Sequence, residues 1–171
     1  DCGIKAIDKV AYAFKKEVDF IICDHHRPGA EIPKAKAVLD PKQEDCDYPF
    51  KELCGCGVGF KLIQALASKK GATIDDLVLY LDLVATAIGA DIVPIVGENR
   101  ILAYHGLKVI NENPRPGFEA ILKQVKKEKL TITDVVFIIA PRFNAAGRMK
   151  HGNHAVTLLC ETDINLAAKY A

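Results

Sequence analysis

The fold is decided by residues 19–29, which read Asp19-Phe20-Ile21-Ile22-Cys23-Asp24-His25-His26-Arg27-Pro28-Gly29. A short isoleucine-containing run that stops at a Pro-Gly turn is typical of a buried strand in a parallel sheet. Open α/β sheets bind their ligands outside the carboxyl ends of the strands. Asp24, His25 and His26 therefore occupy the position at which such a fold performs its chemistry. The alternative is a polar strand end, with Asp24 as a cap and both histidines in solvent.

The segments around this run predict half of a βαβ unit. Apolar residues recur at helical spacing over residues 4–16, which predicts an amphipathic helix before the strand at 18–23. A second extended segment is predicted at 37–39, and the first strand of the unit would precede residue 1. If Asp1 ends that strand and it neighbours the strand ending at Asp24, the strands lie about 4.8 Å apart. Asp1 and the Asp-His-His run can then share a metal ion.

Composition limits the class of protein. A chain of 171 residues can form one domain with a proper core, and 50% hydrophobic with 26% charged residues is ordinary for a globular protein. The net charge of +1 gives no evidence of nucleic-acid binding, so any basic surface must be local. We find no signal peptide and no apolar run that could span a bilayer. Six cysteines without the spacing of a disulfide framework predict reduced thiols, and hence a cytoplasmic protein.

A helix predicted at 75–90 is apolar nearly all round, which indicates burial. It leads into Asp91, a carboxylate in apolar surroundings just before Pro94. Burial of an unpaired carboxylate costs several kcal/mol, so Asp91 must be paired, hydrogen-bonded or metal-bound. A metal ligand and a structural cap both satisfy this requirement.

Two further motifs have the composition of anion sites. Alternating glycines at 55, 57 and 59 precede a helix predicted to run to Lys69, and they suit either a phosphate cradle or close helix packing. Arg142 and Arg148 flank a predicted turn of small residues, which would let both guanidinium groups approach one phosphate. The alternative is that each arginine pairs with a local carboxylate.

Thr131 to Asp134 resembles a capping box that opens a helix.

Three motifs together resemble the DHH (Asp-His-His) phosphoesterase family, and they lie at residues 24–26, at 89–94 with 97–100, and at 141–148. The last of them resembles the branch of exonucleases that are specific for single-stranded DNA. The resemblance implies an α/β fold, with a Rossmann-like parallel sheet flanked by helices and a mostly helical second half. It also implies hydrolysis of phosphodiesters from the 5′ end of single-stranded DNA, in DNA repair and recombination, with two Mn²⁺ or Mg²⁺ ions.

The resemblance assigns roles to individual residues. Asp1, His25 and Asp91 match metal ligands of the family. Asp24 would orient His25 or touch metal itself, and His26 would contact the scissile phosphate; we class both as catalytic. Arg148, supported by Arg142 and Asn144, would bind the 5′ phosphate. The expected partners are single-stranded DNA and, as further candidates, other DNA-repair proteins; no membrane is expected.

Both ends of the chain fall inside helical patterns, which predicts a fragment truncated at both ends. Residues 1–150 would be the DHH domain without its first Asp-x-Asp motif, and 151–171 would begin a helical connection to a second domain. We therefore expect the isolated fragment to bind metal weakly and to lack exonuclease activity. Two alternatives stay open. One is a DHH hydrolase of oligoribonucleotides, cyclic dinucleotides or pyrophosphate, and the other is a non-catalytic scaffold.

Overall fold

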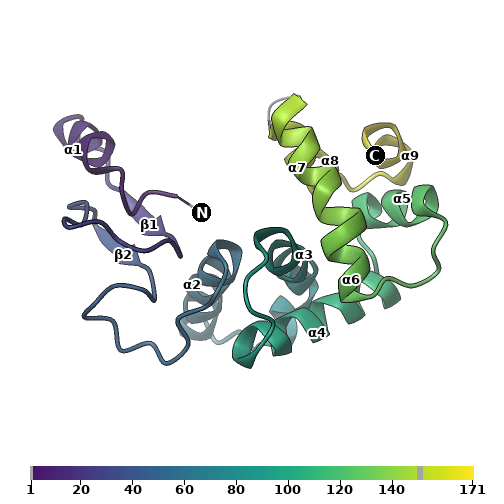
Figure 1. Cartoon of the computed structure of the whole chain (residues 1–171), viewed down its shortest axis with the longest axis horizontal. Coiled ribbons are helices and arrows are strands. Elements are labelled where there is room, and N and C mark those ends of the chain that lie inside the picture. Colours follow the sequence, from purple (N-terminus) through teal and green to yellow (C-terminus); the bar gives the residue numbers. More distant parts are fainter. Residues whose placement is uncertain (1, 150–151) are drawn as a thin grey trace.

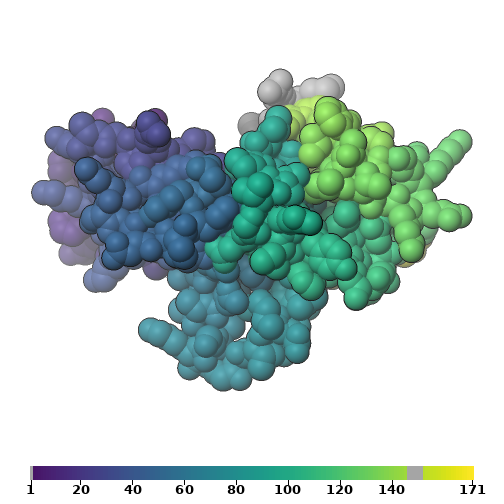
Figure 2. All heavy atoms as spheres, turned by 60° about the horizontal axis from the view of Figure 1, so that its bottom comes forward, coloured from purple at the N-terminus to yellow at the C-terminus, as the bar shows by residue number. Residues whose placement is uncertain are grey.

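A computed structural model describes residues 2–149 and 152–171. The described chain has an α/β fold, with a small parallel sheet at one end and helices over the rest. Figure 1 shows two arms. One arm carries α1, β1 and β2, the other carries α5 and α7–α9, and α2, α3 and α4 lie between them. In Figure 2 the residues coloured as 60–80 project below the body.

The sheet in the described part consists of β1 (Ile21–Cys23) and β2 (Ala37–Leu39). The strands are parallel, and Cys23 is paired with Leu39. The pairing continues one step beyond the strands, because the backbone N–H of Asp24 donates to the carbonyl of Leu39 at 3.0 Å. Helix α1 (Ile7–Lys15) precedes β1 and buries Val10 and Ala13. The predicted helix, strand and strand are confirmed, and Asp24 stands at the carboxyl end of β1.

Three helices between the arms form the first core. They are α2 (Gly55–Lys69), α3 (Leu81–Asp91) and α4 (Gly97–Glu112). Helices α3 and α4 approach so closely that a Cβ on Gly106 would lie 2.0 Å from the carbonyl oxygen of Leu81. Only glycine fits there. The predicted helix at 75–90 differs in its first part, because η1 (Asp75–Tyr80) is 3₁₀-helical and Leu79 is exposed.

The second core lies in the other arm. Its elements are α5 (Pro116–Val125), α6 (Ile132–Asp134), the π-helical turn η2 (Val135–Ile139), α7 (Ala140–Met149), α8 (Asn153–Cys160) and α9 (Ile164–Tyr170). Phe118 of α5 packs with Leu158 of α8 and Ala167 of α9 in one buried cluster. The division into two domains at residue 150 stays a prediction.

A buried ion pair joins the two cores. The Arg115 guanidinium donates to both carboxylate oxygens of Asp82, from Nε at 2.5 Å and from Nη2 at 2.8 Å. Asp82 is 1% exposed, and Arg115 also donates to the carbonyl of Leu159. Since both oxygens of Asp82 are bonded, its burial is compensated.

The turn predicted between Arg142 and Arg148 is wrong, because residues 140–149 form α7. Alanine, arginine and methionine are good helix formers, and they outweigh the asparagine and glycine in this stretch. The capping box of Thr131 and Asp134 is confirmed. In the described part of the chain, no helix is both long and apolar enough to cross a membrane.

The glycines at the start of α2 have different surroundings. A Cβ on Gly57 would lie 3.4 Å from the Leu53 side chain, whereas a Cβ on Gly59 would have no neighbour within 4 Å. The N–H of Gly57 donates to the Cys54 sulfur at 3.3 Å, so one donor of this helix start is already used. Close packing therefore accounts for Gly57 and not for Gly59.

Candidate metal centre

Asp24 anchors the end of β1. Its Oδ2 accepts the backbone N–H of Ile4 at 2.9 Å, and its Oδ1 accepts the N–H of His25 at 2.8 Å and that of His26 at 3.1 Å. Oδ1 also contacts Nδ1 of His26 at 2.8 Å. Because Ile4 precedes α1 and the histidines follow β1, the buried Asp24 carboxylate fixes the start of α1 to the Asp-His-His turn.

The hydrogen bonds to Asp24 keep it ionised. Burial raises the pKa of this carboxyl, but the bonds from Ile4, His26 and His25 outweigh burial and lower the pKa to about 2. Asp24 contacts the ring of His26, and both of its oxygens accept hydrogen bonds. Its expected role in orienting His25 or touching metal stays a prediction.

His25 and Asp91 come together from distant parts of the chain. Nε2 of His25 lies 3.8 Å from Oδ2 of Asp91, which ends α3. The His25 side chain is buried, whereas that of Asp91 is 29% exposed. Burial lowers the pKa of His25, although the Asp91 carboxylate opposes the shift. Burial therefore favours the neutral imidazole, which is the form that binds metal ions.

The spacing of the pair is near that of two ligands of one divalent ion without being equal to it. With bonds of about 2.1 Å, two ligands of an octahedral ion lie about 3 Å apart when adjacent and about 4.2 Å apart when opposite. The observed 3.8 Å matches neither value, so binding of one ion requires a small movement of a side chain. Imidazole and carboxylate together suit Mn²⁺, and carboxylate suits Mg²⁺. Within residues 2–149 and 152–171, His, Cys, Asp and Glu form no group of three or more that could hold a metal ion. The pair fits as part of a centre.

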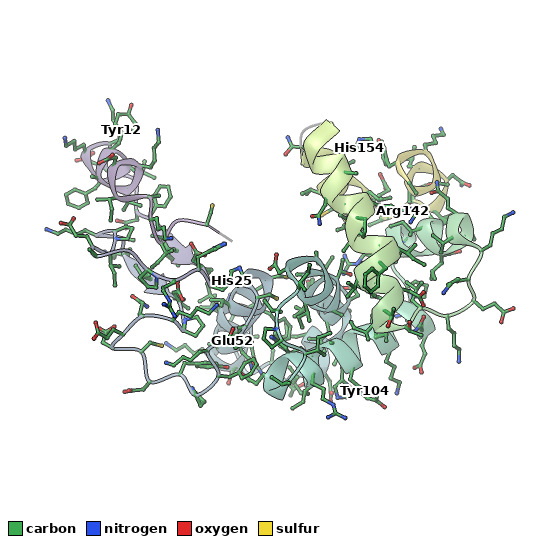
Figure 3. All side chains as sticks on the ribbon, in the orientation of Figure 1. Tyr12, His25, Glu52, Tyr104, Arg142 and His154 are labelled. Atoms are coloured by element: carbon green, nitrogen blue, oxygen red, sulfur yellow. The ribbon has the colours of Figure 1, made fainter. Side chains whose placement is uncertain are left out.

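His26 lies beside this pair with a different exposure. Its ring centroid is 4.6 Å from that of His25, in an edge-to-face arrangement. The side chain of His26 is 57% exposed, and its Nδ1 is held by Asp24. Figure 3 shows His25 between the strands and α2. With Nδ1 held by the Asp24 carboxylate, the protonated imidazole of His26 can donate from Nε2 to a phosphate oxygen.

Asp40 is a buried carboxylate at the same sheet edge as Asp24, and the motifs did not single it out. It follows β2 as Asp24 follows β1, and it is 2% exposed. Its Oδ1 accepts the N–H of Lys42 at 2.8 Å, but its Oδ2 is buried without a hydrogen-bond partner among the described residues. Burial raises the pKa of Asp40, and the nearby Asp24 carboxylate adds to that shift. The available signal was its position, a carboxylate directly after the second parallel strand.

Asn99 holds the segment that follows Asp91. Its side chain is fully buried, and Nδ2 donates to the carbonyls of Glu52 at 2.6 Å and Pro94 at 3.0 Å. Pro94 lies three residues after Asp91, and Glu52 precedes α2. Asn99 therefore connects the metal-ligand segment to the loop at 41–54. The chain turns directly after Asp91, because Ile92 has a left-handed backbone with φ of 54°.

The predicted phosphate-binding residues lie on α7. Arg142 is exposed, and its Nη1 donates to the carbonyl of Ile138 in the preceding turn at 2.7 Å. Figure 3 places Arg142 on the arm opposite His25. Arg142 and Arg148 are separated by about 9 Å along a helix rather than flanking a turn. The side chain of Arg148, like Asp1 as a whole, lies outside the described residues. Asn144 is exposed.

The sequence and the site define the class of protein. The model of the DHH family, N-terminal domain, matches residues 1–88. These residues include the Asp24-His25-His26 turn at the end of β1. The chain therefore belongs to the DHH family, as the motifs predicted.

Within that family, relatives called RecJ match nearly the whole chain. It is 41% identical over 165 residues to the single-stranded-DNA-specific exonuclease RecJ of Bacillus subtilis, covering 95% of this chain and 20% of that protein. The RecJ of Escherichia coli is 37% identical over 171 residues, covering 93% of this chain and 30% of that protein. The chain thus spans between a fifth and a third of the length of these two relatives.

Solved structures agree with the sequence matches. A crystal structure of exonuclease RecJ bound to manganese superposes with a TM-score of 0.88 at 32% identity, over 99% of this chain and 43% of that one. RecJ from Thermus thermophilus in complex with Mn²⁺ gives the same TM-score and identity, over 99% of this chain and 25% of that one. The predicted fold class is confirmed.

Proposed function

We propose that the protein containing this chain hydrolyses phosphodiesters of single-stranded DNA from the 5′ end, with two Mn²⁺ or Mg²⁺ ions. The observation that carries the proposal is the meeting of His25 and Asp91, 3.8 Å apart, beside a His26 ring held by Asp24. The RecJ relatives are named as single-stranded-DNA-specific exonucleases, and their solved structures hold Mn²⁺ or Mg²⁺. A role in DNA repair and recombination, in the cytoplasm and with other repair proteins, follows from the same likeness.

The proposed roles follow from exposure and contacts. His25 and Asp91, with Asp1, would hold the ions, which when bound supply Lewis acidity and activate water for attack on phosphorus. His26 is exposed and oriented, so it would hydrogen-bond to the scissile phosphate and stabilise its developing charge. Asp24 would fix the orientation of His26. Arg142, Asn144 and Arg148 would bind the 5′ phosphate. Lack of activity in the isolated 171-residue chain stays a prediction.

The substrate class is tested with the native protein and Mn²⁺. The substrates are a 5′-phosphorylated single strand, the matching duplex, an oligoribonucleotide, a cyclic dinucleotide and pyrophosphate. We expect mononucleotides to be released from the 5′ end of the single strand at least tenfold faster than from the duplex. Faster turnover of any of the last three substrates would assign another reaction of the DHH family. No turnover of any substrate would favour a scaffold.

A further inference from the structure

A mostly apolar hollow is lined by the two chain neighbours of Asp91, whereas Asp91 itself lines another hollow together with Cys23 and Cys56. The first hollow has a volume of about 530 Å³, within the range of ligand sites. Ala90 and Ile92, the two chain neighbours of Asp91, line it on one side, and Phe137, Pro141 and Asn144 line it on the other. Consecutive Cα atoms are about 3.8 Å apart, so the hollow starts within one residue of the candidate metal ligand.

The hollow is built by the π-helical turn before α7. The N–H of Ala140 bonds to the carbonyl of Val135, five residues back, and Pro141 follows. Pro141 has no N–H to donate to the carbonyl of Phe137, so a regular α-helix would be interrupted here. The turn packs tightly on α3, since a Cβ on Gly89 would lie 2.8 Å from Cγ1 of Val135. Such π-turns occur frequently at functional sites.

Two large apolar side chains at this hollow are exposed. Phe137 is 74% exposed and Ile92 is 80% exposed. By contrast, the nearby Phe143 packs its ring edge-to-face on Phe118. The Ile92 side chain is presented there by a left-handed backbone that β-branched residues rarely adopt. Phe143 of α7 thus faces the core, whereas Phe137 of the preceding turn η2 has an accessible aromatic ring.

The lining has the chemistry of a nucleobase site. Among the described side chains that line the hollow, none is charged and Asn144 is the one polar group. A phosphate would need cations, whereas a base needs a flat apolar contact and a few hydrogen bonds. Stacking on aromatic side chains is the general way in which proteins hold unpaired bases. The amide of asparagine can both donate to and accept from a base edge.

We propose that this hollow binds the base of a nucleotide adjacent to the scissile phosphate, with Phe137 stacking on the base and Asn144 hydrogen-bonded to the base edge rather than to the 5′ phosphate. The inference rests on the proposed function for the position of the phosphate at His25 and Asp91. Because stacking does not depend on base identity, the site would accept every sequence and would require an unpaired strand. A base paired in a duplex cannot enter the hollow.

The test measures binding of short 5′-phosphorylated strands to the native protein in EDTA, so that no strand is cleaved. An abasic residue is placed in turn at each of the first four positions. Stacking contributes about 1–3 kcal/mol per base, so we expect one abasic position to weaken binding roughly 5- to 150-fold. Phe137→Ala should weaken binding of the intact strand by the same factor and abolish the difference between intact and abasic strands. Phe137→Trp should preserve the difference.

The matched control is Tyr104→Ala, which removes an exposed aromatic ring from α4, on another part of the surface (Figure 3). This variant should keep the full abasic effect. If the abasic effect is equal in the native protein and in Phe137→Ala, or if Phe137→Ala only lowers the melting temperature, another part of the protein covers the hollow and the proposal is wrong. If the abasic position weakens binding only when Phe137 is present, but the protein cleaves no DNA, the base site is supported and the proposed nuclease activity is wrong. If the protein cleaves DNA but Phe137 does not affect the abasic difference, the nuclease activity is supported and the base site is wrong.

Discussion

Nε2 of His25 and Oδ2 of Asp91 lie 3.8 Å apart, although one residue follows β1 and the other ends α3. The sheet and the helical body therefore each contribute one ligand to the candidate centre. Its geometry depends on the contacts that hold the end of α3 against the loop at 41–54 and the sheet.

Asn99→Ala is expected to lower the free energy of unfolding by about 2–4 kcal/mol. The substitution leaves the buried carbonyls of Glu52 and Pro94 without a donor, and each unsatisfied group costs about 1–3 kcal/mol. Urea denaturation of the native protein and the variant measures the loss. Asn113→Ala, at an exposed position, should change stability by less than about 0.5 kcal/mol. Equal effects of the two variants would show that the Asn99 contacts do not hold this segment.

Glu98→Gln is expected to remove a pH-dependent part of the stability. Glu98 accepts from the Tyr48 hydroxyl at 2.6 Å and pairs with Lys61 at 2.7 Å. Burial raises the pKa of Glu98, but these two partners lower it overall. The stabilisation from the ionised form is therefore complete above the ordinary pKa of 4.5 and is lost as the pH falls through the lowered value.

The measurement for Glu98 is the unfolding free energy from pH 7 down to pH 3. We expect the variant to be less stable at pH 7 by about 1–2 kcal/mol, and the difference to shrink towards pH 3. Glu112→Gln, from an exposed pair with Lys108, is the control and should show little difference at either pH. A difference for Glu98→Gln that stays constant with pH would contradict the assignment.

Ile92→Gly is expected to raise the free energy of unfolding by roughly 0.5–1 kcal/mol. The left-handed backbone with φ of 54° costs a β-branched residue about 1–2 kcal/mol, and glycine avoids this cost. Little burial is lost, because the side chain is 80% exposed. Val156→Gly, at an exposed position inside helix α8, should instead destabilise. Thermal denaturation of both variants measures these changes. A lower melting temperature for Ile92→Gly than for the wild type would show that the Ile92 side chain makes stabilising contacts in the native protein.

Arg115→Met is expected to destabilise the fold by about 3–5 kcal/mol, because it leaves the Asp82 carboxylate buried and unpaired. The double variant Arg115→Met with Asp82→Leu should recover most of this loss, since both charges are then removed. Lys123→Ala, from an exposed pair with Glu119, should cost less than about 1 kcal/mol. If the double variant is no more stable than Arg115→Met alone, the lost stability comes from the packing of the Arg115 side chain and not from the unpaired charge of Asp82.

The order of the elements could be predicted from local patterns. The helix at 55–69, the strand at 37–39 and the capping box at Thr131 coincide with the structure. The helix at residues 140–149 could not be predicted in this way. Its glycine and asparagine suggest a turn, but the neighbouring alanines favour a helix, and the helix is what forms. The π-helical turn at 135–139 has no simple pattern of its own, and its signal was Pro141 inside a helical stretch.

The candidate site shows the same limit. The motifs placed Asp24, His25 and Asp91 at the ends of their elements, and the structure brings His25 and Asp91 together. The sequence could not show that Asp24 bonds to the His26 ring, or that Asp40 keeps a buried oxygen without a partner among the described residues. The first contact depends on the side-chain rotamers within one turn, and the second on what surrounds the end of β2; spacing along the chain encodes neither.

The most direct test of the account is Mn²⁺ binding to the native protein, measured by calorimetry for the wild type, His25→Ala, Asp91→Asn and the double variant that carries both substitutions. Asp19→Asn, which removes an exposed carboxylate near the start of β1, is the charge control. We predict that each site variant weakens Mn²⁺ binding at least tenfold, that the double variant loses less than the sum of the two, and that the control binds as the wild type does. Unchanged Mn²⁺ affinity in both His25→Ala and Asp91→Asn would contradict the assignment of this pair as metal ligands.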